Sequence, residues 1–117
     1  MKDNLIAIKT FEFSISIIKL FIQLKDENEY VISKQLLRSA TSIGANVEES
    51  IAAQSRRDFI HKLSIANKEA RETKYWLRLL EKSEITKLNV QIELNEIEHI
   101  LNIITKIIMS SQKAGIK

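Results

Sequence analysis

The sequence predicts an all-α protein, an antiparallel up-and-down four-helix bundle in a single domain over residues 1–117. Apolar residues recur at spacings of three and four over most of the chain, which places them on one side of a helix at about 100° per residue. Polar segments divide this pattern into four stretches, and no proline interrupts any of them. The heptad-like spacing favours nearly antiparallel packing at about 20°. The expected helices cover residues 4–24, 31–53, 56–82 and 87–112.

The first expected helix carries two adjacent apolar stripes. One consists of Ile8, Phe11, Ile15, Ile18 and Ile22, and the other of Phe13, Ile17, Leu20 and Leu24. A surface helix normally has one apolar face somewhat over 100° wide, so this helix is expected to be covered from two sides. A polar loop follows at residues 25–29, and the second helix is expected to begin between Tyr30 and Lys34, with Ser33 as one possible cap.

The second and third helices form the centre of the predicted bundle. Their core-facing residues are Leu36, Ala40, Ile43, Val47 and Ile51 on the second, and Phe59, Leu63, Ala66, Ala70, Thr73, Leu77 and Leu80 on the third. Small residues around Gly44 predict a close approach of two helix axes at that point. Between the two helices, Ser55 is expected to cap the third helix, with Asp58 in its first turn.

The fourth expected helix repeats the double pattern of the first. One stripe is formed by Leu94, Ile97, Leu101, Ile104 and Ile108, and another by Ile100, Ile103 and Ile107. A second stripe left in water would be a contiguous apolar patch of a size that monomeric proteins rarely expose. We therefore predict a homo-oligomer in which a subunit interface covers it. The alternative is that isoleucine is simply common in this chain.

The composition excludes several kinds of chemistry. The chain has no cysteine, which excludes disulfides, cysteine-ligated zinc and thiol catalysis, and favours a cytoplasmic location. Its two glycines cannot form a phosphate-binding loop, and charges within the apolar N-terminal segment exclude a signal peptide or membrane span there. Di-iron bundles use a Glu-x-x-His spacing twice, whereas Glu96 and His99 supply it once, and His61 forms no triad. We expect no enzyme activity, cofactor or metal.

The clearest functional signal is positive charge on the third helix. Residues 55–83 contain 8 basic and 4 acidic side chains, whereas residues 1–54 contain 6 and 7 and residues 84–117 contain 4 and 4. One stripe facing away from the core collects Arg57, His61, Lys68, Arg71, Tyr75, Arg78 and Lys82. Such a stripe suits a phosphate backbone, and the tyrosine ring can stack on a base. The alternative is an ordinary solvated face.

The two central helices also resemble a known family. The resemblance is carried by Gln35, Leu36, Arg38, Ala40, Ser42, Ile43, Asn46 and Glu49, followed by Phe59, Leu63, Ile65, Ala66, Glu69, Glu72 and Leu77. This pattern resembles bacterial four-helix-bundle proteins first noted as products of intervening sequences within 23S ribosomal RNA genes. It is also similar to the accessory variability determinant of diversity-generating retroelements. The resemblance implies a closed pentameric ring.

The resemblance further implies a polar network between helices or subunits. Its expected members are Arg38, Ser42, Asn46, Glu49, Glu69 and Glu72. The Arg38 guanidinium suits bidentate bridging of a carboxylate, and we predict that it pairs with Glu49, with Glu72 nearby. The alternative is a solvated polar face.

The function that these patterns favour is binding without catalysis. We expect a homo-oligomer, a pentamer by the resemblance, that binds RNA or another nucleic acid through the basic stripe. The alternative is a protein-interaction module that docks a partner, such as a reverse transcriptase, on the same surface.

Overall fold

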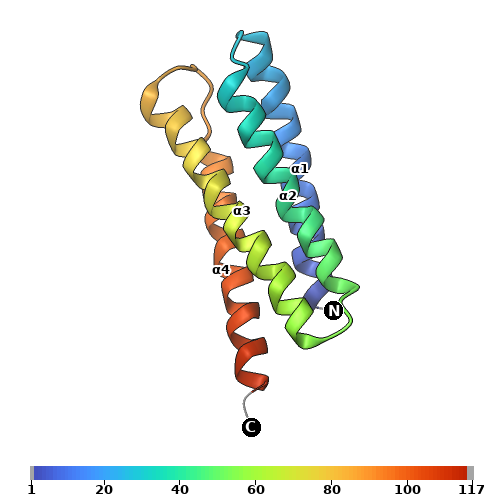
Figure 1. Ribbon diagram of the computed structural model, residues 1–117. Helices are drawn as coiled ribbons and strands as arrows, with labels where there is room; N and C mark the ends of the chain where they lie inside the picture. Colours follow the sequence, from blue (N-terminus) through green and yellow to red (C-terminus); the bar gives the residue numbers. More distant parts are fainter. Residues whose placement is uncertain (1, 116–117) are drawn as a thin grey trace.

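The structure is a bundle of four helices, as the sequence predicts. The computed structural model describes residues 2–115, with side chains from residue 5 onward, so residues 1, 116 and 117 of the predicted domain lie outside the described part. The helices are α1 (Lys2–Asp26), α2 (Val31–Ile51), α3 (Arg56–Ser83) and α4 (Gln91–Ala114). Successive helices run in opposite directions, so both ends of the chain lie at the same end of the bundle (Figure 1). Residues 2–115 contain no strand, and the all-α class is confirmed.

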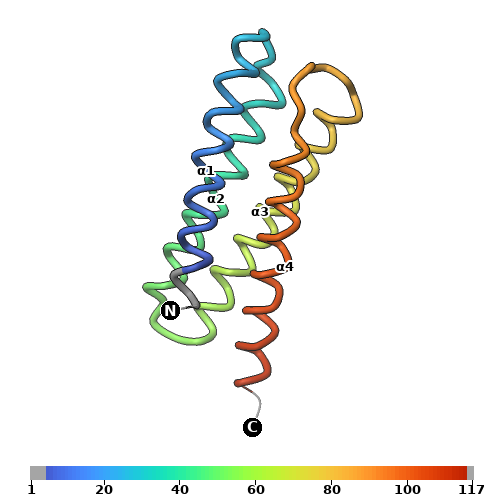
Figure 2. Tube along the Cα trace, turned by 180° about the vertical axis from the view of Figure 1, so that it is seen from behind, coloured from blue at the N-terminus to red at the C-terminus, as the bar shows by residue number. Residues whose placement is uncertain are grey.

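Each helix packs on two neighbours. The contacting pairs are α1–α2, α2–α3, α3–α4 and α1–α4, of which α2–α3 is the most extensive and α1–α4 the least. In the diagonal pairs α1–α3 and α2–α4, no Cα atoms of the described residues come within 8 Å of each other, so these helices meet only through their core side chains. From behind, α1 and α4 lie in front of α2 and α3 (Figure 2). The Cα atoms span 53 × 22 × 22 Å, so the bundle offers four long corners, and α1 and α3 occupy opposite ones.

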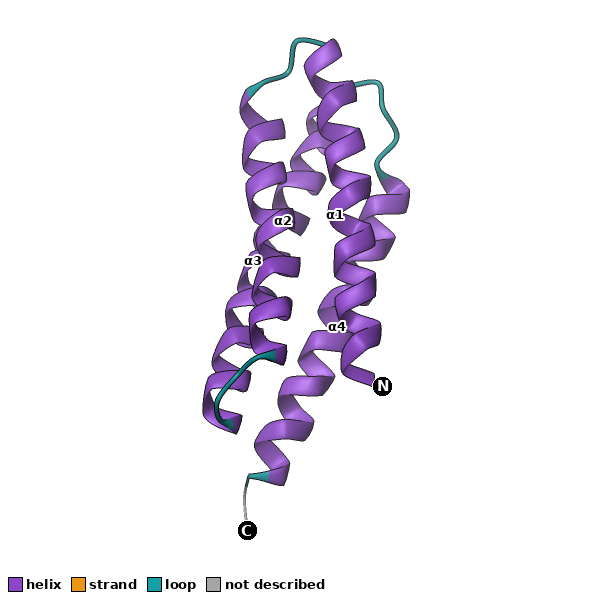
Figure 3. Cartoon of the chain, turned by 90° about the vertical axis from the view of Figure 1, so that its right-hand side faces the viewer, coloured by secondary structure: helices purple, strands orange, loops and turns teal. Residues whose placement is uncertain are grey.

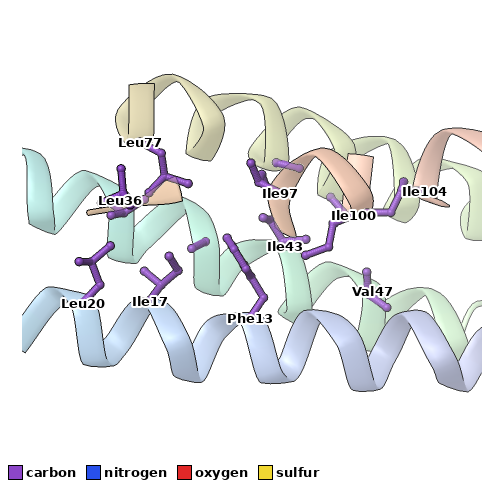
Figure 4. Close-up of a cluster of buried hydrophobic side chains, with 14 of the residues drawn as sticks. Phe13, Ile17, Leu20, Leu36, Ile43, Val47, Leu77, Ile97, Ile100 and Ile104 are labelled. Carbon is purple, nitrogen blue, oxygen red and sulfur yellow. The ribbon is translucent and has the colours of Figure 1, made fainter. Parts of the chain in front are cut away.

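The core runs along the bundle axis between all four helices. Figure 4 shows aliphatic side chains from each helix pointing toward one another, among them Ile17 of α1, Leu36 of α2, Leu77 of α3 and Ile97 of α4. Each of these four residues is completely inaccessible to solvent. Burying one such side chain contributes about 1.5 to 3 kcal/mol, so the aligned inner faces dominate the stability of the fold.

The fold buries one of the two apolar stripes of α1 and leaves the other exposed. Those on the inner side, which are buried, are Phe13, Ile17, Leu20 and Leu24. Those exposed to solvent are Ile8, Phe11, Ile15, Ile18 and Ile22. The stripes were predicted to be adjacent, but at about 100° per residue their centres lie on opposite sides of the helix, so a bundle can cover only one of them.

Both stripes of α4 lie within reach of the same core. Ile97, Ile100 and Ile104 are buried, while Leu101 and Ile103 are partly buried and pack against them. The two stripes adjoin and form one broad face, so neighbouring helices of the same chain cover most of it. The expectation that α4 needs covering from outside is therefore wrong for these residues, and the unpartnered apolar face belongs to α1.

The start of α2 is stabilised by Glu29, not by Ser33. The buried Glu29 carboxylate accepts hydrogen bonds from the backbone N–H groups of Val31, Ile32 and Ser33 at 3.0, 3.0 and 2.7 Å. Ser33 lies inside the helix and donates its hydroxyl to the Glu29 carbonyl at 2.9 Å. The first N–H groups of a helix have no intrahelical acceptor, so a carboxylate placed there satisfies them and complements the helix dipole.

The turn between α2 and α3 follows the sequence expectation closely. Ser55 has extended backbone angles, and its hydroxyl oxygen accepts a hydrogen bond from the Asp58 N–H at 3.1 Å, which confirms the predicted cap. The second helix ends at Ile51, two residues earlier than expected. Ile51 is consequently half exposed and does not belong to the core to which it was assigned.

The connection between α3 and α4 is longer than the sequence suggested. Glu84 ends α3 in a left-handed conformation with φ of 57°, and α4 begins only at Gln91, four residues later than predicted. Loop side chains accept hydrogen bonds from the backbone N–H groups at this point. Thr86 Oγ1 accepts from the Leu88 N–H at 3.1 Å, and Asn89 Oδ1 accepts from the Gln91 N–H at 2.9 Å. This loop and the one between α1 and α2 lie at the same end of the bundle (Figure 3). These competing local bonds explain the late start of the helix.

Gly44 marks a close approach of α1 and α2, as its small neighbours predict. A Cβ added to Gly44 would lie 3.5 Å from both the Ser14 hydroxyl and the Thr10 carbonyl oxygen, which is ordinary contact distance. The hydroxyl groups facing it donate within α1, from Ser14 to the Thr10 carbonyl at 3.0 Å and from Thr10 to the Ile6 carbonyl at 2.8 Å. The absent side chain leaves a shallow hollow on the outer surface between the two helices.

Candidate nucleic-acid interface

The outer face of α3 forms a continuous exposed stripe. The inner side of this helix is buried through Leu63, Ala66, Ala70, Thr73, Leu77 and Leu80. The same periodicity places a second set on the opposite side, and all of its members are exposed: Arg57, His61, Lys68, Arg71, Tyr75, Arg78 and Lys82. We call this set the basic stripe. From Arg57 to Lys82 it extends about 37 Å along a straight helix.

Most cations of the basic stripe have no carboxylate partner. Within the described part of the chain, Arg57, Lys68, Arg71 and Arg78 form no ion pair, and Lys82 only approaches Glu81 at 3.8 Å. Lys68 and Arg71, and likewise Arg78 and Lys82, are about one helical turn apart, within a Debye length near 8 Å in physiological salt, so the two charges of each pair reinforce the same local potential. The stripe is therefore a source of uncompensated positive potential.

Two of the four acidic side chains of α3, Glu69 and Glu72, are neutralised on its flank toward α2. Arg38 of α2 reaches Glu69 at 3.1 Å and also pairs with Glu72. Its guanidinium thus spans two carboxylates one turn apart, a geometry that its planar fork permits. The Arg38 side chain remains 52% exposed, whereas that of Glu69 is 14% exposed. These two negative charges are thereby held away from the basic stripe, while Asp58 and Glu81 lie beside its members Arg57 and Lys82.

The polar network differs in part from the predicted one. Glu49 does not pair with Arg38, because Lys62 of α3 donates to its carboxylate at 2.9 Å. Asn46 donates to the carbonyl and hydroxyl oxygens of Ser42 at 2.9 and 3.2 Å, which is a bond within α2 and not between helices. Arg38 and Glu49 are 11 residues apart, about three turns along α2, so a carboxylate on the facing helix is nearer to Arg38 than Glu49 is.

Tyr75, at the centre of the basic stripe, is held in place by Trp76. The two rings meet edge to face with centroids 5.2 Å apart and an interplanar angle of 69°. Trp76 in turn donates its indole N–H to Glu72 at 2.9 Å, so the ring is anchored to the carboxylate that Arg38 also binds. Tyr75 is 53% exposed and presents its free face outward. The sequence analysis missed this support, although Trp76 is the only tryptophan and directly follows Tyr75.

A second link between α2 and α3 was also missed. The hydroxyl groups of Thr73 and Ser39 share a hydrogen bond of 2.9 Å in the core. Both residues are completely buried. Ser39 could have been recognised as a core residue, because it lies three residues after Leu36. Its polar hydroxyl is accounted for only by Thr73 on the facing helix, which donates a hydrogen bond to it. This pair fixes the register of the helix that carries the basic stripe, since a buried hydroxyl without a partner is costly.

Other candidate groups add little chemistry. His61 and His99 are exposed, and Glu96 lies 3.8 Å from Lys9 of α1. Among the described residues no three His, Cys, Asp or Glu side chains are grouped in a way that could hold a metal ion. None of the described helices is long and apolar enough to cross a membrane.

A hollow adjoins one end of the basic stripe. It lies between the start of α3 and the end of α4, has a volume of about 650 Å³, and is lined by Arg56, Arg57, Ile60, Ser111, Gln112 and Gly115. Two arginines at its rim extend the positive surface toward α4.

Comparisons with known proteins agree with this architecture. The family described as 23S rRNA-intervening sequence protein matches residues 2–110. A crystal structure at 1.70 Å resolution of a protein of unknown function from Bacteroides thetaiotaomicron, assigned to the S23 ribosomal protein family, is 47% identical in sequence. The match covers 93% of this chain and 99% of that one, with a TM-score of 0.86. No curated protein matches the chain.

Proposed function

Because the chain belongs to the 23S rRNA-intervening sequence protein family, we propose that it is a non-enzymatic, homo-oligomeric protein that binds RNA through the basic stripe of α3. The observation that carries the proposal is the row of exposed cations without carboxylate partners. The cysteine-free composition agrees with a cytoplasmic location, where RNA is available.

The chemistry of the stripe suits a phosphate backbone better than a small ligand. Arginine and lysine side chains spread over about 37 Å can follow several consecutive phosphates. Tyr75 in their midst offers an aromatic face held at a fixed angle by Trp76, and a stacked base gains about 1 to 3 kcal/mol. All side chains of the stripe are exposed to solvent, so none is enclosed in a way that would select one base. The expected recognition is therefore of backbone and shape.

Several copies acting together can bind RNA even though the positive charge of each copy is modest. The net charge of the chain is only +3, so one subunit offers few contacts to RNA. Linking binding sites in an oligomer raises their effective concentration and can strengthen overall binding by about 10²- to 10⁴-fold. The pentameric ring implied by the family resemblance would present five stripes to one RNA.

Charge reversal on the stripe tests the proposal. Replacing Lys68, Arg71 and Arg78 by glutamate is expected to abolish binding to a structured RNA, while helix content and oligomer mass stay unchanged. For the parent protein, four phosphate contacts per subunit predict a log–log salt slope near −3, and a steeper one if several subunits engage the RNA. Gel-shift titration at several salt concentrations measures both quantities.

The matched control reverses three exposed lysines elsewhere. Lys34, Lys87 and Lys106 lie on α2, in the α3–α4 loop and on α4, and replacing all three by glutamate changes the net charge by the same amount. This control is expected to bind RNA within about tenfold of the parent, because only long-range charge is altered. Equal binding by the stripe variant and the parent would reject the proposal. A stripe that captures a protein partner but no RNA would favour the docking module instead.

A further inference from the structure

The hollow between the start of α3 and the end of α4 has the size of a ligand site. Its volume of about 650 Å³ lies within the range of about 300 to 1,000 Å³ that is usual for small-molecule sites. Arg56, Arg57 and the half-buried Ile60 line it from α3, and Ser111 and Gln112 line it from α4. We call it the end hollow, because it lies where α4 ends (Figure 1). It combines cations, hydrogen-bonding groups and one apolar contact.

The end hollow is positively charged. Within the described part of the chain, Arg56 and Arg57 form no ion pair, and no carboxylate lines the hollow. Asp58 follows them in the sequence, but it lines a neighbouring hollow, which shares only Arg57 with this one. The end hollow therefore favours an anionic ligand.

Gly115 leaves room for the Arg56 side chain at the rim of the end hollow. Its φ of −81° is one that any residue can adopt, so the backbone conformation does not require a glycine here. A Cβ added to Gly115 would lie 3.4 Å from Arg56 Cδ and 3.6 Å from Arg56 Nη1, so a longer side chain would take space that Arg56 now occupies. The Arg56 guanidinium thus lies against the last turn of α4, beside the side chains that complete the hollow.

Hydrogen bonding within α4 leaves two side chains available to a ligand. The Gly115 N–H donates to the carbonyl oxygens of Ser111 and Gln112 at 3.3 and 3.1 Å, so these acceptors, which would repel an anion, are already engaged. The Ser111 hydroxyl and the Gln112 amide can each donate a hydrogen bond to a phosphate or ribose oxygen. Ile60 offers an apolar surface to the sugar or the base.

Two arginines at consecutive positions suit a phosphate group with two negative charges. A phosphate monoester carries a charge of about −1.5 to −2 at pH 7, whereas a phosphate inside a nucleic-acid strand carries only one. The guanidinium group also binds phosphate oxygens in pairs, which a lysine cannot do. Arg56 and Arg57 together therefore match a terminal phosphate better than an internal one.

The end hollow is continuous with the basic stripe. Arg57 belongs to both. The other cations of the stripe follow α3 away from the hollow as far as Lys82, and α3 itself begins at Arg56. An RNA strand whose backbone follows the stripe reaches the end hollow where this row of cations stops. The hollow is thus placed to receive the end of the strand.

We propose that the end hollow binds the phosphate monoester of a nucleotide, and that its ligand is the terminal phosphate of the RNA strand on the basic stripe. The inference rests on the proposed RNA binding and adds to it a preference for phosphorylated strand ends. A free nucleoside monophosphate presents the same group, so both sources are compared in the test.

Fluorescence anisotropy with the full chain measures the preference. The probes are three internally labelled single-stranded RNAs of one sequence, with a 5′-phosphate, with a 3′-phosphate, or with hydroxyl groups at both ends. A length of about 12 nucleotides, at about 3.4 Å each, is enough to follow the stripe of about 37 Å. One of the two phosphorylated RNAs is expected to bind about tenfold more tightly than the hydroxyl-ended RNA, because charge-assisted hydrogen bonds are added.

Two variants and a matched control locate the preference. Arg56→Gln removes a guanidinium that lies outside the basic stripe, and the three RNAs should then bind alike. Gly115→Leu fills the rim and displaces Arg56, with the same expected result. The control is Lys113→Gln, which removes an exposed cation from the last turn of α4 that does not line the hollow, and it should keep the tenfold preference.

The outcomes separate this inference from RNA binding itself. Equal binding of the three RNAs by the parent overturns the inference and leaves the basic stripe intact. A preference that survives both Arg56→Gln and Gly115→Leu also overturns it. A parent that binds none of the RNAs rejects the stripe instead, and calorimetric titration with uridine 5′-monophosphate then decides the role of the hollow. Binding that Arg56→Gln abolishes would support a site for free nucleotides, while no binding would overturn the inference.

Discussion

Helices α1 and α3 have similar inner faces and very different outer ones. Each buries one stripe of residues spaced three and four apart, such as Phe13 and Ile17 on α1 or Leu77 and Leu80 on α3. Opposite these stripes, α1 exposes isoleucine and phenylalanine, while α3 exposes arginine and lysine. The two helices lie diagonally across the bundle, and among the described residues no Cα atom of one comes within 8 Å of a Cα atom of the other. The comparison shows that the inner pattern of a bundle helix specifies its place in the fold, whereas its outer pattern is free to specify a partner.

The largest expected effect is a loss of stability when a buried core side chain of α1 or α3 is shortened. Ile17→Ala on α1 and Leu77→Ala on α3 each remove a completely buried side chain, and each is expected to lower the free energy of unfolding by about 2 to 5 kcal/mol. The exposed and unpaired Arg71 is the control, since Arg71→Ala should change stability by no more than about 0.5 kcal/mol. Urea denaturation measures all three. A loss below about 1 kcal/mol at either core position would contradict the equivalence of the inner faces.

A smaller loss of stability is expected when the ion pairs of Arg38 with Glu69 and Glu72 are removed. Arg38→Ala leaves Glu69 and Glu72 without their cation and is expected to cost about 1 to 2 kcal/mol, between the values for exposed and for buried pairs, because the guanidinium is half exposed. RNA affinity should fall at the same time, since two uncompensated negative charges on the same helix then lower the positive potential of the basic stripe. Lys34→Ala, on the same helix without an ion pair, is the control. Equal stability of the two variants would place the Arg38 pairs among ordinary surface contacts.

The smallest effect is a dependence on alkaline pH. A hydrogen bond with Glu49, and secondarily its negative charge, raises the pKa of Lys62 above its ordinary value of 10.5. A raised pKa in the folded state means that this pair stabilises the protein fully below pH 10.5 and that the contribution disappears as the pH rises through the raised pKa.

Glu49→Gln checks this dependence. The difference in stability between the variant and the parent should be present at about pH 8 and smaller above about pH 11. A difference that does not change with pH would mean that Lys62 keeps its partner through contacts other than charge. Because Glu49 and Lys62 lie between α2 and α3, the basic stripe and the exposed apolar face of α1 should be unaffected at neutral pH.

The candidate site was predictable to the extent that it depends on one helix. The members of the basic stripe follow from the period of α3, because a helix of known phase places each side chain by its number alone. The partners of Arg38 were not predictable in the same way. From the sequence alone, Glu49 was an equally reasonable partner for Arg38. That Arg38 pairs with Glu69 and Glu72 depends on the axial register of α2 against α3. The buried pair of Ser39 and Thr73 belongs to that register as well.

The sequence by itself determined the number of helices, their antiparallel order, their inner faces and the cap at Ser55, because all of these depend on periodicity and on local hydrogen bonding. The same periodicity places the second stripe of α1 opposite its core face and that of α4 beside its own. Only the tertiary structure decided which neighbouring helices cover each stripe. The extra apolar residues of α4 adjoin its core face and find neighbours in the same chain, while those of α1 point the opposite way. It also decided that the apolar and basic faces lie at opposite corners, since helix order around a bundle depends on packing between elements distant in the chain.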